Sequence, residues 1–368
     1  MKFTVVGAGL AGIALADSLV EAGVEPSQLC VVDDADPRRG SSSPAIILHP
    51  FPGRRMDLRR GQGDAFERGW ARLNAWSDAL GDDWWDIHSM VRPLTDDDKG
   101  AQLRESWESA RNEYPELIEI ELMSPDEVAR QFPGIEPSVE SLVYRPAASV
   151  MLSELLQRLR DRLEEQGVRF VDDRMVEMTS SGGGWTLGLD GGEQLESDTV
   201  VLAVGASLDE YFPGLDLRRK AGEIVVLDPG AQKLPALVNA NKHMAARSDG
   251  LWGLGSTYFR VSEWDDRDDD AVAEELKAGI VDVVPAVADA EVVEVWRGER
   301  GVFGSDHMPL VGPVPGNDGL FCCAAFGSKG LLWALAAAQD LAVELCTGRE
   351  VISKYMRTTR MSDDKWEW

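Results

Sequence analysis

Three glycines near the start of the chain are spaced for binding a phosphorylated nucleotide. Gly7, Gly9 and Gly12 follow an apolar run in the stretch VVGAGLAGIALADSL. Between a strand and a helix, the first glycine allows a tight bend, the second lets a pyrophosphate approach bare backbone, and the third lets the helix pack closely. The N–H groups of Leu10 and Ala11 open that helix, whose partial positive charge favours phosphate.

A carboxylate stands where such a fold recognises ribose. Asp33, followed by Asp34, ends the apolar stretch 28–34, about 20 residues after the glycines. Its carboxylate can accept hydrogen bonds from a ribose diol and disfavours a 2′-phosphate, so we expect NAD or FAD rather than NADP. The sequence has no second glycine motif of this kind. One dinucleotide that takes electrons directly from an organic substrate is therefore the simpler interpretation.

The elements that must position these residues form a parallel α/β unit. Strands are predicted over 2–6 and 28–34, with a helix over 10–23 between them, which is the βαβ arrangement of a parallel sheet. Ser124 and Glu127 predict a capping box at the start of another helix. Further helices are predicted over 64–85, 151–166 and 268–284, and further strands over 168–173, 199–206, 222–228 and 251–261.

Composition limits the other classes of function. A chain of 368 residues, 44% of them apolar, is long enough for two domains. The N-terminus has no basic segment followed by an apolar one, so we expect no signal peptide. The sequence has no run of 18 apolar residues, so we expect a cytoplasmic protein without a membrane span. The four cysteines and four histidines have no metal-like spacing, so we expect reduced thiols and no metal site. A net charge of −27 favours a protein from a salty cytoplasm over one with a basic partner, and it disfavours unaided nucleic-acid binding.

Five motifs in a fixed order resemble the D-amino-acid-oxidase-like family of FAD oxidoreductases. This family includes glycine oxidase, sarcosine oxidase and the oxidase half of the bifunctional enzyme that matures the wobble uridine of tRNA. The motifs are VVGAGLAGIALADSLVEAG, SSSPAIILHPFPGRR, VEM with the later TVVLAVGA, ERGVFGSDHMPLVGPVP, and FGSKGLLWALAAAQDLAVELCTG.

The resemblance implies the residues that hold FAD. Ser41 and Ser42 would lie in the loop that passes the pyrophosphate, Val176 would pair its backbone with adenine, and Gly205 would approach the ADP. The last motif would lie beside the flavin ring, with Gly327, Ser328, Lys329, Gly330 and Leu331 at its turn. Sarcosine oxidases attach FAD through a cysteine before the DxxP motif, and none lies between 291 and 321 here, so we expect non-covalent FAD.

The resemblance also suggests a clamp for a substrate carboxylate. Arg300 is the best candidate and Arg297 the next, because the family's amino-acid oxidases place an arginine shortly before this DxxP motif. The interval from Arg300 to Asp306 is one residue longer than in glycine oxidase, and Gly301 aligns most simply with the clamp. The alternative is an arginine that bonds strand carbonyls or an acidic neighbour.

Three further side chains are candidates for the catalytic site. Tyr258 would cover or hydrogen-bond the substrate, Lys329 would approach the flavin edge or a substrate anion, and His49 would make a polar contact near the flavin. The alternatives are a half-buried strand tyrosine, a surface lysine on a turn and a structural turn histidine. Ile46 replaces a glycine that is common in the family.

The predicted fold is α/β, with a Rossmann-like FAD/NAD(P)-binding domain of the glutathione-reductase type and a second, mixed-sheet α+β substrate domain. We expect the FAD domain over 1–60, 142–221 and 300–355, the substrate domain over 61–141 and 222–299, and a C-terminal tail over 356–368, whose last eight residues we expect to be frayed.

The predicted function is an FAD-dependent oxidase or dehydrogenase. It would oxidise a C–N bond of a small amine or amino acid by hydride transfer to flavin N5, with dioxygen or another acceptor reoxidising the flavin. Two alternatives stay open: a tRNA wobble-uridine-modifying oxidase of the same family, and a flavin-binding scaffold without turnover.

Overall fold

The chain folds into two compact units, each assembled from separate segments. The structure is a computed structural model that describes residues 1–53, 55–95, 97–261 and 267–366. Unit 1 comprises Met1–Ser42, Glu154–Lys220 and Glu299–Trp368, and unit 2 comprises Ser43–Ser153 and Ala221–Gly298.

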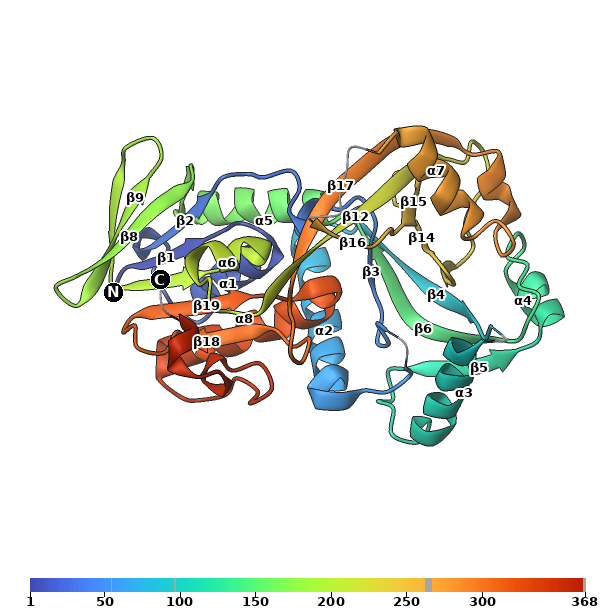
Figure 1. Ribbon diagram of the computed structural model, residues 1–368, viewed down its shortest axis with the longest axis horizontal. Helices are drawn as coiled ribbons and strands as arrows, with labels where there is room; N and C mark the ends of the chain where they lie inside the picture. The colour runs from blue at the N-terminus through green and yellow to red at the C-terminus, as the bar shows by residue number, and fades with distance from the viewer. Residues whose placement is uncertain (54, 96, 262–266, 367–368) are drawn as a thin grey trace. The chain divides into compact units, whose positions relative to one another are not determined.

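Unit 1 is built on a six-stranded sheet in the order β18-β19-β11-β1-β2-β7 (Figure 1). All neighbours are parallel except the edge strand β18, which runs antiparallel to β19. The central strands read FTVV and TVVL and are buried throughout, as expected for a parallel sheet covered on both faces. The strands are β1 Phe3–Val6, β2 Leu29–Asp33, β7 Arg169–Asp172, β11 Thr199–Leu202, β18 Leu310–Pro313 and β19 Leu320–Ala324.

A three-stranded antiparallel meander and several helices complete unit 1. Leu187 and Leu195 of the meander share a hydrophobic cluster with Val200 and Leu202 of β11. Helices α1 and α8 pack against each other. The meander consists of β8 Met175–Ser181, β9 Gly184–Leu189 and β10 Gln194–Ser197, and the helices are α1 Leu10–Glu21, α5 Leu152–Gln166, α6 Leu208–Tyr211 and α8 Gly330–Thr347.

The first turns of α1 and α8 lie at the same edge of this sheet. Helix α1 follows β1 and α8 follows β19, and both strands run in the same direction with β11 between them. Each helix therefore starts at the carboxyl edge, where open α/β sheets bind their ligands. Neither helix has a side-chain cap from its own N-cap residue or an acidic residue in its first turn.

Unit 2 contains a mixed ten-stranded sheet. Its main order is β16-β12-β15-β14-β13-β4-β6-β3, and β17 pairs with β12 while β5 pairs with β6. The strands are β3 Ile46–Leu48, β4 Trp85–Pro93, β5 Glu119–Met123, β6 Ser141–Val150, β12 Leu217–Asp228, β13 Leu237–Asn239, β14 His243–Ala246, β15 Trp252–Gly255, β16 Phe259–Arg260 and β17 Glu291–Phe303.

Among the residues described, the helices that accompany the unit 2 sheet are α2 Gln62–Leu80, α3 Asp98–Ala110, α4 Pro125–Gln131 and α7 Asp269–Ala278. The capping box predicted from Ser124 and Glu127 is present at the start of α4. Val272 and Leu276 of α7 are fully buried in a cluster with Val225 and Leu254 of the sheet. The predicted fold class, a Rossmann-like domain with a second mixed-sheet domain, is confirmed.

Besides shifts of one residue at Ala221 and Glu299, the boundaries of the units differ from the expected domain boundaries in three longer segments. Residues 43–60 and 142–153 lie in unit 2, because β3 pairs with β6 and β6 pairs with β4. Residues 356–368 lie in unit 1.

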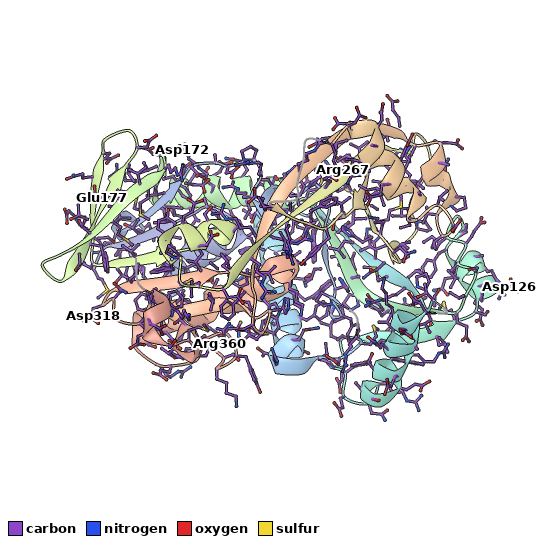
Figure 2. The ribbon with its side chains drawn as sticks, viewed as in Figure 1. Asp126, Asp172, Glu177, Arg267, Asp318 and Arg360 are labelled. Carbon is purple, nitrogen blue, oxygen red and sulfur yellow. The ribbon has the colours of Figure 1, made fainter. Side chains whose placement is uncertain are left out.

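The C-terminal segment packs on unit 1 and is not frayed over the residues described. Thr358 is fully buried, and Trp366 is 1% exposed with its ring 5.0 Å from that of Phe212. Arg360, labelled in Figure 2, donates to Asp306 over 3.1 Å and to the Met308 carbonyl over 3.1 Å. Apolar packing and an arginine with several acceptors therefore order a segment whose composition suggested a loose end.

One described segment, Gly327–Thr347, is long and apolar enough to cross a membrane by length and composition. More than half of it is buried inside the protein, and its helix α8 packs on α1. A core helix passes the same test, so this segment is weak evidence for a membrane span.

Candidate FAD and substrate site

The glycine turn of unit 1 is packed so tightly that side chains are excluded at two positions. Gly7 has φ +102°, and a Cβ there would lie 2.6 Å from the Ala203 carbonyl oxygen. A Cβ on Gly12 would lie 1.8 Å from the Gly7 oxygen. Both contacts are shorter than any Cβ tolerates, so the turn needs glycine to bring α1 against β1 and β11. This is the backbone cradle that a dinucleotide diphosphate requires.

The backbone N–H at the start of α1 donates a hydrogen bond to an oxygen from another loop. The N–H of Leu10 donates to the Ser41 hydroxyl over 3.0 Å. A Cβ on Gly9 would lie 3.1 Å from the Ser41 hydroxyl oxygen, so Gly9 and Ser41 lie opposite each other at the start of α1. Ser42 belongs to the same short 3-10 turn, Gly40–Ser42. The serine loop thus meets the glycine turn at the helix N-terminus, where anions bind.

Asp33 holds the turn and its neighbouring loop together. This carboxylate is 7% exposed and accepts hydrogen bonds from the Ala8 N–H over 2.7 Å and the Ala35 N–H over 3.2 Å. Arg39 pairs with it over 2.5 Å. Sequence reasoning missed Arg39, since an arginine in a serine-rich loop carries no signal of its partner. Asp34 is exposed, and its carboxylate accepts a local hydrogen bond from the Asp36 N–H over 3.3 Å.

Two positions expected near adenine and ADP have unusual backbone geometry. The pairing of β8 with β9 shifts register between Met175 and Glu177, which leaves Val176 at a bulge with 57% of its surface exposed. A bulged residue keeps backbone groups that the ladder does not use. Gly205, with φ +58°, begins the 3-10 turn Gly205–Ser207 after β11.

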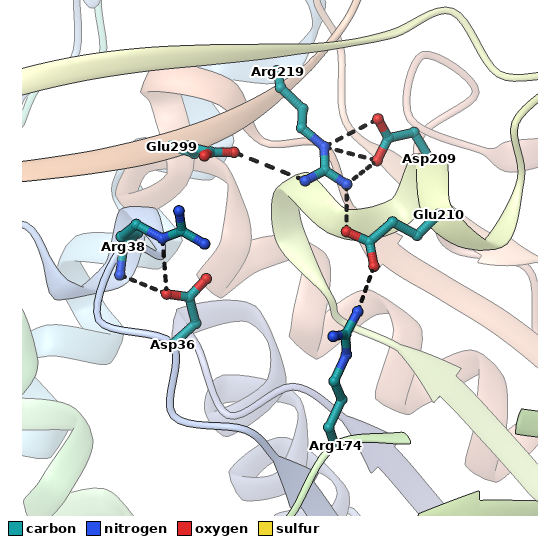
Figure 3. A network of polar contacts seen from close by, with 7 residues as sticks. All are labelled: Asp36, Arg38, Arg174, Asp209, Glu210, Arg219 and Glu299. Carbon is teal, nitrogen blue, oxygen red and sulfur yellow. Dashed lines mark hydrogen bonds and ion pairs between the residues drawn. The ribbon is translucent and has the colours of Figure 1, made fainter. Parts of the chain in front are cut away.

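An ion-pair network surrounds the turn that follows β11 (Figure 3). Arg219 donates to Asp209 and to Glu210, each over 2.6 Å, and lies 3.9 Å from Glu299. Hydrogen bonding to Asp209 raises the pKa of Arg219. Arg174 also pairs with Glu210, over 3.0 Å. This network ties α6 to the end of β17 within unit 1.

The neighbours of Arg300 on β17 indicate the face of the strand on which its side chain lies. Successive side chains of a strand alternate between faces. Glu299 faces Arg219, and a Cβ on Gly301 would lie 2.9 Å from Ala206 Cα, so these two residues share one face. Arg300 therefore lies on the opposite face, together with Val302.

The Arg300 face of β17 is the one that meets the turn before α8. Val302 Cγ2 lies 3.2 Å from the position a Cβ on Gly327 would take. Position 301, which aligns most simply with the family's clamp, faces the backbone of Ala206 and has no room for a side chain. Arg300 thus lies toward the turn that the family resemblance places beside the flavin ring.

The turn before α8 combines left-handed backbone with a free helix start. Gly327 has φ +58° and begins the 3-10 turn Gly327–Lys329, Ser328 is exposed, and Gly330 begins α8. Lys329 is partly buried, and Leu331 is 5% exposed in the first turn of α8. The N-terminus of α8 offers positive potential to a group that carries negative charge.

The remaining candidates lie in unit 2. Tyr258 is 54% exposed and precedes β16. His49 is buried after β3, where its Nδ1 lies 3.0 Å from the Tyr144 hydroxyl. Burial lowers the pKa of His49 to about 3, and the positive charge of Arg92 contributes. His49 is therefore a neutral, buried group.

Arg297, the second clamp candidate, is engaged within unit 2. Its guanidinium donates to Asp269 over 2.6 Å and to the Arg267 carbonyl over 2.7 Å. It also lies 3.6 Å from Glu223, whose surface is fully buried. Arg267, labelled in Figure 2, pairs with the same carboxylate over 2.9 Å. These contacts favour a structural role for Arg297.

Among the residues described, no group of three or more His, Cys, Asp or Glu side chains is arranged to hold a metal ion. All four cysteines are free, with Cys322 and Cys323 buried.

Comparisons with known proteins identify relatives over most of the chain. A glycine oxidase from Pseudomonas aeruginosa is 29% identical over 267 residues, 67% of this chain and 69% of that protein. A tRNA 5-methylaminomethyl-2-thiouridine biosynthesis bifunctional protein from Polaromonas sp. is 27% identical over 375 residues, 93% of this chain but 56% of that protein. The crystal structure of glycine oxidase from Geobacillus kaustophilus superimposes with a TM-score of 0.83 at 18% identity, covering 96% of each chain.

The sequence profile of the FAD dependent oxidoreductase family, abbreviated DAO, matches residues 2–344. The glycine cradle, the carboxylate at the end of β2 and the starts of α1 and α8, which lack a cap from their own N-cap residues, fit the dinucleotide that this family binds. The family expected from the motifs is confirmed, and with it an enzyme that uses FAD; the scaffold alternative gains no support. The chain belongs to the DAO family of FAD-dependent oxidoreductases.

Proposed function

We propose that this enzyme oxidises a C–N bond of a small amine or amino acid. The observation that carries the proposal is the position of Arg300 on the face of β17 that meets the Gly327 turn. Similarity to a glycine oxidase over 67% of the chain supports the same class of substrate. Bound FAD would supply the acceptor, at N5, for the hydride that leaves the α-carbon.

The residues of unit 1 would hold FAD without a covalent bond. The Gly7–Gly12 turn, the N–H groups of Leu10 and Ala11 and the hydroxyls of Ser41 and Ser42 would bind the diphosphate. Asp33 would share its carboxylate between Arg39 and the ribose diol. The other contacts would come from Asp34, Val176 and Gly205 toward the adenosine, and from Gly327, Ser328, Lys329, Gly330 and Leu331 toward the flavin ring.

Arg300 would orient the substrate by its carboxylate. A guanidinium offers two parallel N–H donors that match the two oxygens of a carboxylate. Held this way, an amino acid keeps its α-carbon and its neutral amine in one orientation, which is most of what such an oxidation asks of the protein. The imine product would then be hydrolysed by water. Tyr258 would cover the substrate, and Lys329 would add positive charge near it.

An anaerobic reduction experiment tests this proposal. Purified yellow protein is mixed, without oxygen, with glycine, sarcosine, other N-methyl amino acids and simple amines, and the visible flavin absorbance is followed. We expect bleaching by at least one carboxylate-bearing amine, with the colour returning when air is admitted. If none of the panel bleaches a protein that dithionite does reduce, the proposal is wrong.

A second candidate, a tRNA wobble-uridine-modifying oxidase, is supported by the bifunctional relative that matches 93% of this chain. The net charge of −27 weighs against it, because phosphate backbones bind basic surfaces. A gel-shift with total tRNA at low salt separates the two. A retarded complex would favour the tRNA substrate.

The cytoplasmic location and the adaptation to salt also stay proposals. Free thiols at all four cysteines suit a reducing compartment, and the acidic composition suits high salt. Measuring the unfolding temperature from low to molar KCl tests the second point, and a protein from a salty cytoplasm is expected to gain stability with salt.

A further inference from the structure

The two carboxylate oxygens of Asp33 have different numbers of hydrogen-bond donors in unit 1. Oδ1 accepts the Ala8 N–H over 2.7 Å. Oδ2 accepts the Ala35 N–H over 3.2 Å and also Nη1 of Arg39, which donates over 2.5 Å. An ionised carboxylate has roughly four lone-pair sites, about two on each oxygen. Among the residues described, Oδ2 therefore has both of its sites occupied, whereas Oδ1 keeps one.

The backbone of the loop around Arg39 is anchored on both sides. The Arg39 N–H donates to the Asp36 carbonyl over 3.2 Å, and the Ser42 N–H donates to the Arg39 carbonyl over 2.9 Å. The loop also pairs with the end of β17, because the Glu299 N–H donates to the Arg38 carbonyl over 2.7 Å and Arg39 forms an isolated bridge with Glu299. All of these residues belong to unit 1, so their contacts place Arg39 within one compact body.

The Arg39 side chain is itself partly enclosed beside Asp33. It is 31% exposed, and its Nε is buried without a hydrogen bond among the described residues. The neighbouring Arg38 has a side chain that is 60% exposed and pairs with Asp36 at the surface. A carboxylate as buried as that of Asp33 normally requires a cationic partner. The pair of Asp33 and Arg39 is therefore a built part of the site, unlike the surface pair next to it.

This occupancy limits what Asp33 can accept from a cofactor ribose. Asp33 ends β2, where a fold of this type holds the adenosine ribose of a dinucleotide. The 2′ and 3′ hydroxyls of a ribose are neighbours, and both can donate to one carboxylate if each of its oxygens has a free lone pair. Because Arg39 and Ala35 use both sites of Oδ2, only Oδ1 has a site left for a hydroxyl.

We propose that Arg39 is a positioning residue that occupies Oδ2 of Asp33, so that the site recognises one hydroxyl of the FAD adenosine ribose and not both. Arg39 acts through Asp33 and sets which features of the nucleotide the site reads. The inference goes beyond the proposed amine oxidation, because it concerns the cofactor and holds for any substrate. The carboxylate is oriented by the fold before the nucleotide binds, which lowers the cost of binding.

The test measures how well ADP, 2′-deoxy-ADP and 3′-deoxy-ADP displace FAD from the full-length protein, followed by flavin fluorescence. In the wild type we expect one deoxynucleotide to compete as well as ADP. The other should bind at least roughly tenfold more weakly, because it lacks one hydrogen bond to a charged acceptor. In R39A, Oδ2 regains a lone pair while the Ala8 and Ala35 N–H groups still hold the carboxylate. Both deoxynucleotides should then bind more weakly than ADP.

R38A is the matched control, because the Arg38 side chain lies in the same loop and pairs with Asp36 instead of Asp33. It should keep the wild-type pattern. Wild-type protein that binds the two deoxynucleotides equally well overturns the inference even if R39A fails to fold, and so does R39A with the wild-type pattern. ADP that fails to displace FAD overturns it as well. Failure of every amine to bleach the flavin would instead refute the proposed function and leave the nucleotide pattern as it is.

Discussion

At the carboxyl edge of the unit 1 sheet, the groups placed to meet a ligand belong mainly to the backbone, whereas the polar groups around Tyr144 of unit 2 belong to buried side chains that meet one another. Gly7 and Gly12 act by having no side chain, and the first N–H of α1 is left to the hydroxyl of Ser41. In unit 2, Tyr144, His49 and Arg92 are buried, and the Tyr144 hydroxyl lies 3.0 Å from His49 Nδ1.

This difference predicts which kind of amino-acid substitution damages each region. A backbone site is damaged by adding atoms, because a new Cβ has nowhere to go. A side-chain cluster is damaged by removing atoms, because the partners left behind are buried and unsatisfied. The predictions below test each half of this comparison, from the largest expected effect to the smallest.

The largest effect is expected from Arg300→Ala. Losing two charge-assisted hydrogen bonds to a carboxylate costs about 3 kcal/mol, or roughly 100-fold in kcat/KM for an amino-acid substrate. Steady-state kinetics with an amino acid and with the matching amine that lacks the carboxylate measures it. The amine should lose little. Arg297→Ala is the control, and an equal loss in both variants would contradict the assignment of the clamp.

Gly12→Ala should weaken FAD binding by roughly 10- to 100-fold, because the added methyl group overpacks the contact between α1 and the turn at a cost of about 1–3 kcal/mol. Titration of the apoprotein with FAD, followed by flavin fluorescence, gives the two dissociation constants. Gly188→Ala is a matched control on β9, where a Cβ would meet ordinary contacts at 3.4 Å. Unchanged FAD affinity in Gly12→Ala would mean that this turn does not hold the diphosphate.

His49 should make the protein less stable in mild acid. Its pKa is lowered from 6.5 to about 3 in the folded chain, by burial first and by the positive charge of Arg92. The unfolded chain therefore binds the proton first, and folding loses stability as the pH falls below about 6.5. Between pH 7 and pH 5 the free energy of unfolding should drop about 2 kcal/mol more in the wild type than in His49→Gln. Urea unfolding at both pH values measures this, and parallel changes in the two proteins would contradict a neutral, buried His49.

The smallest effect is expected from Arg360→Ala. Arg360 is half-buried, donates to Asp306 and to the Met308 carbonyl, and holds the C-terminal segment against β18. Its loss should lower the free energy of unfolding by about 1–2 kcal/mol. Arg38→Ala removes a pair with Asp36 at the surface and should cost under about 0.5 kcal/mol. Equal unfolding temperatures for the two variants would mean that the C-terminal segment adds nothing to unit 1.

The comparison also explains how much of the molecule was predictable from sequence. Gly7, Gly9 and Gly12 signal a backbone site because their spacing belongs to one turn, and the strands on either side share an apolar signature. The capping box at Ser124 and Glu127 is local in the same way. Such features need only a few consecutive residues to be recognised.

The grouping of Tyr144, His49 and Arg92 could not be predicted, since these residues are separated by long stretches of chain and meet only through strand pairing. Tyr144 reaches His49 because β6 pairs with β3, and Arg92 reaches Tyr144 because β6 also pairs with β4. The C-terminal segment was misjudged for a similar reason. Trp366 finds a partner in Phe212, which no local pattern reveals.

The central claim, that the unit 1 glycine edge seats one FAD without a covalent bond, has a direct measurement. The protein is purified, saturated with FAD, freed of excess and denatured in acid, and the flavin in solution and on the polypeptide is quantified. The account predicts one FAD per chain, all of it released into solution. A colourless protein that takes up no added FAD would contradict the claim, and flavin that stays on the polypeptide would contradict its non-covalent form.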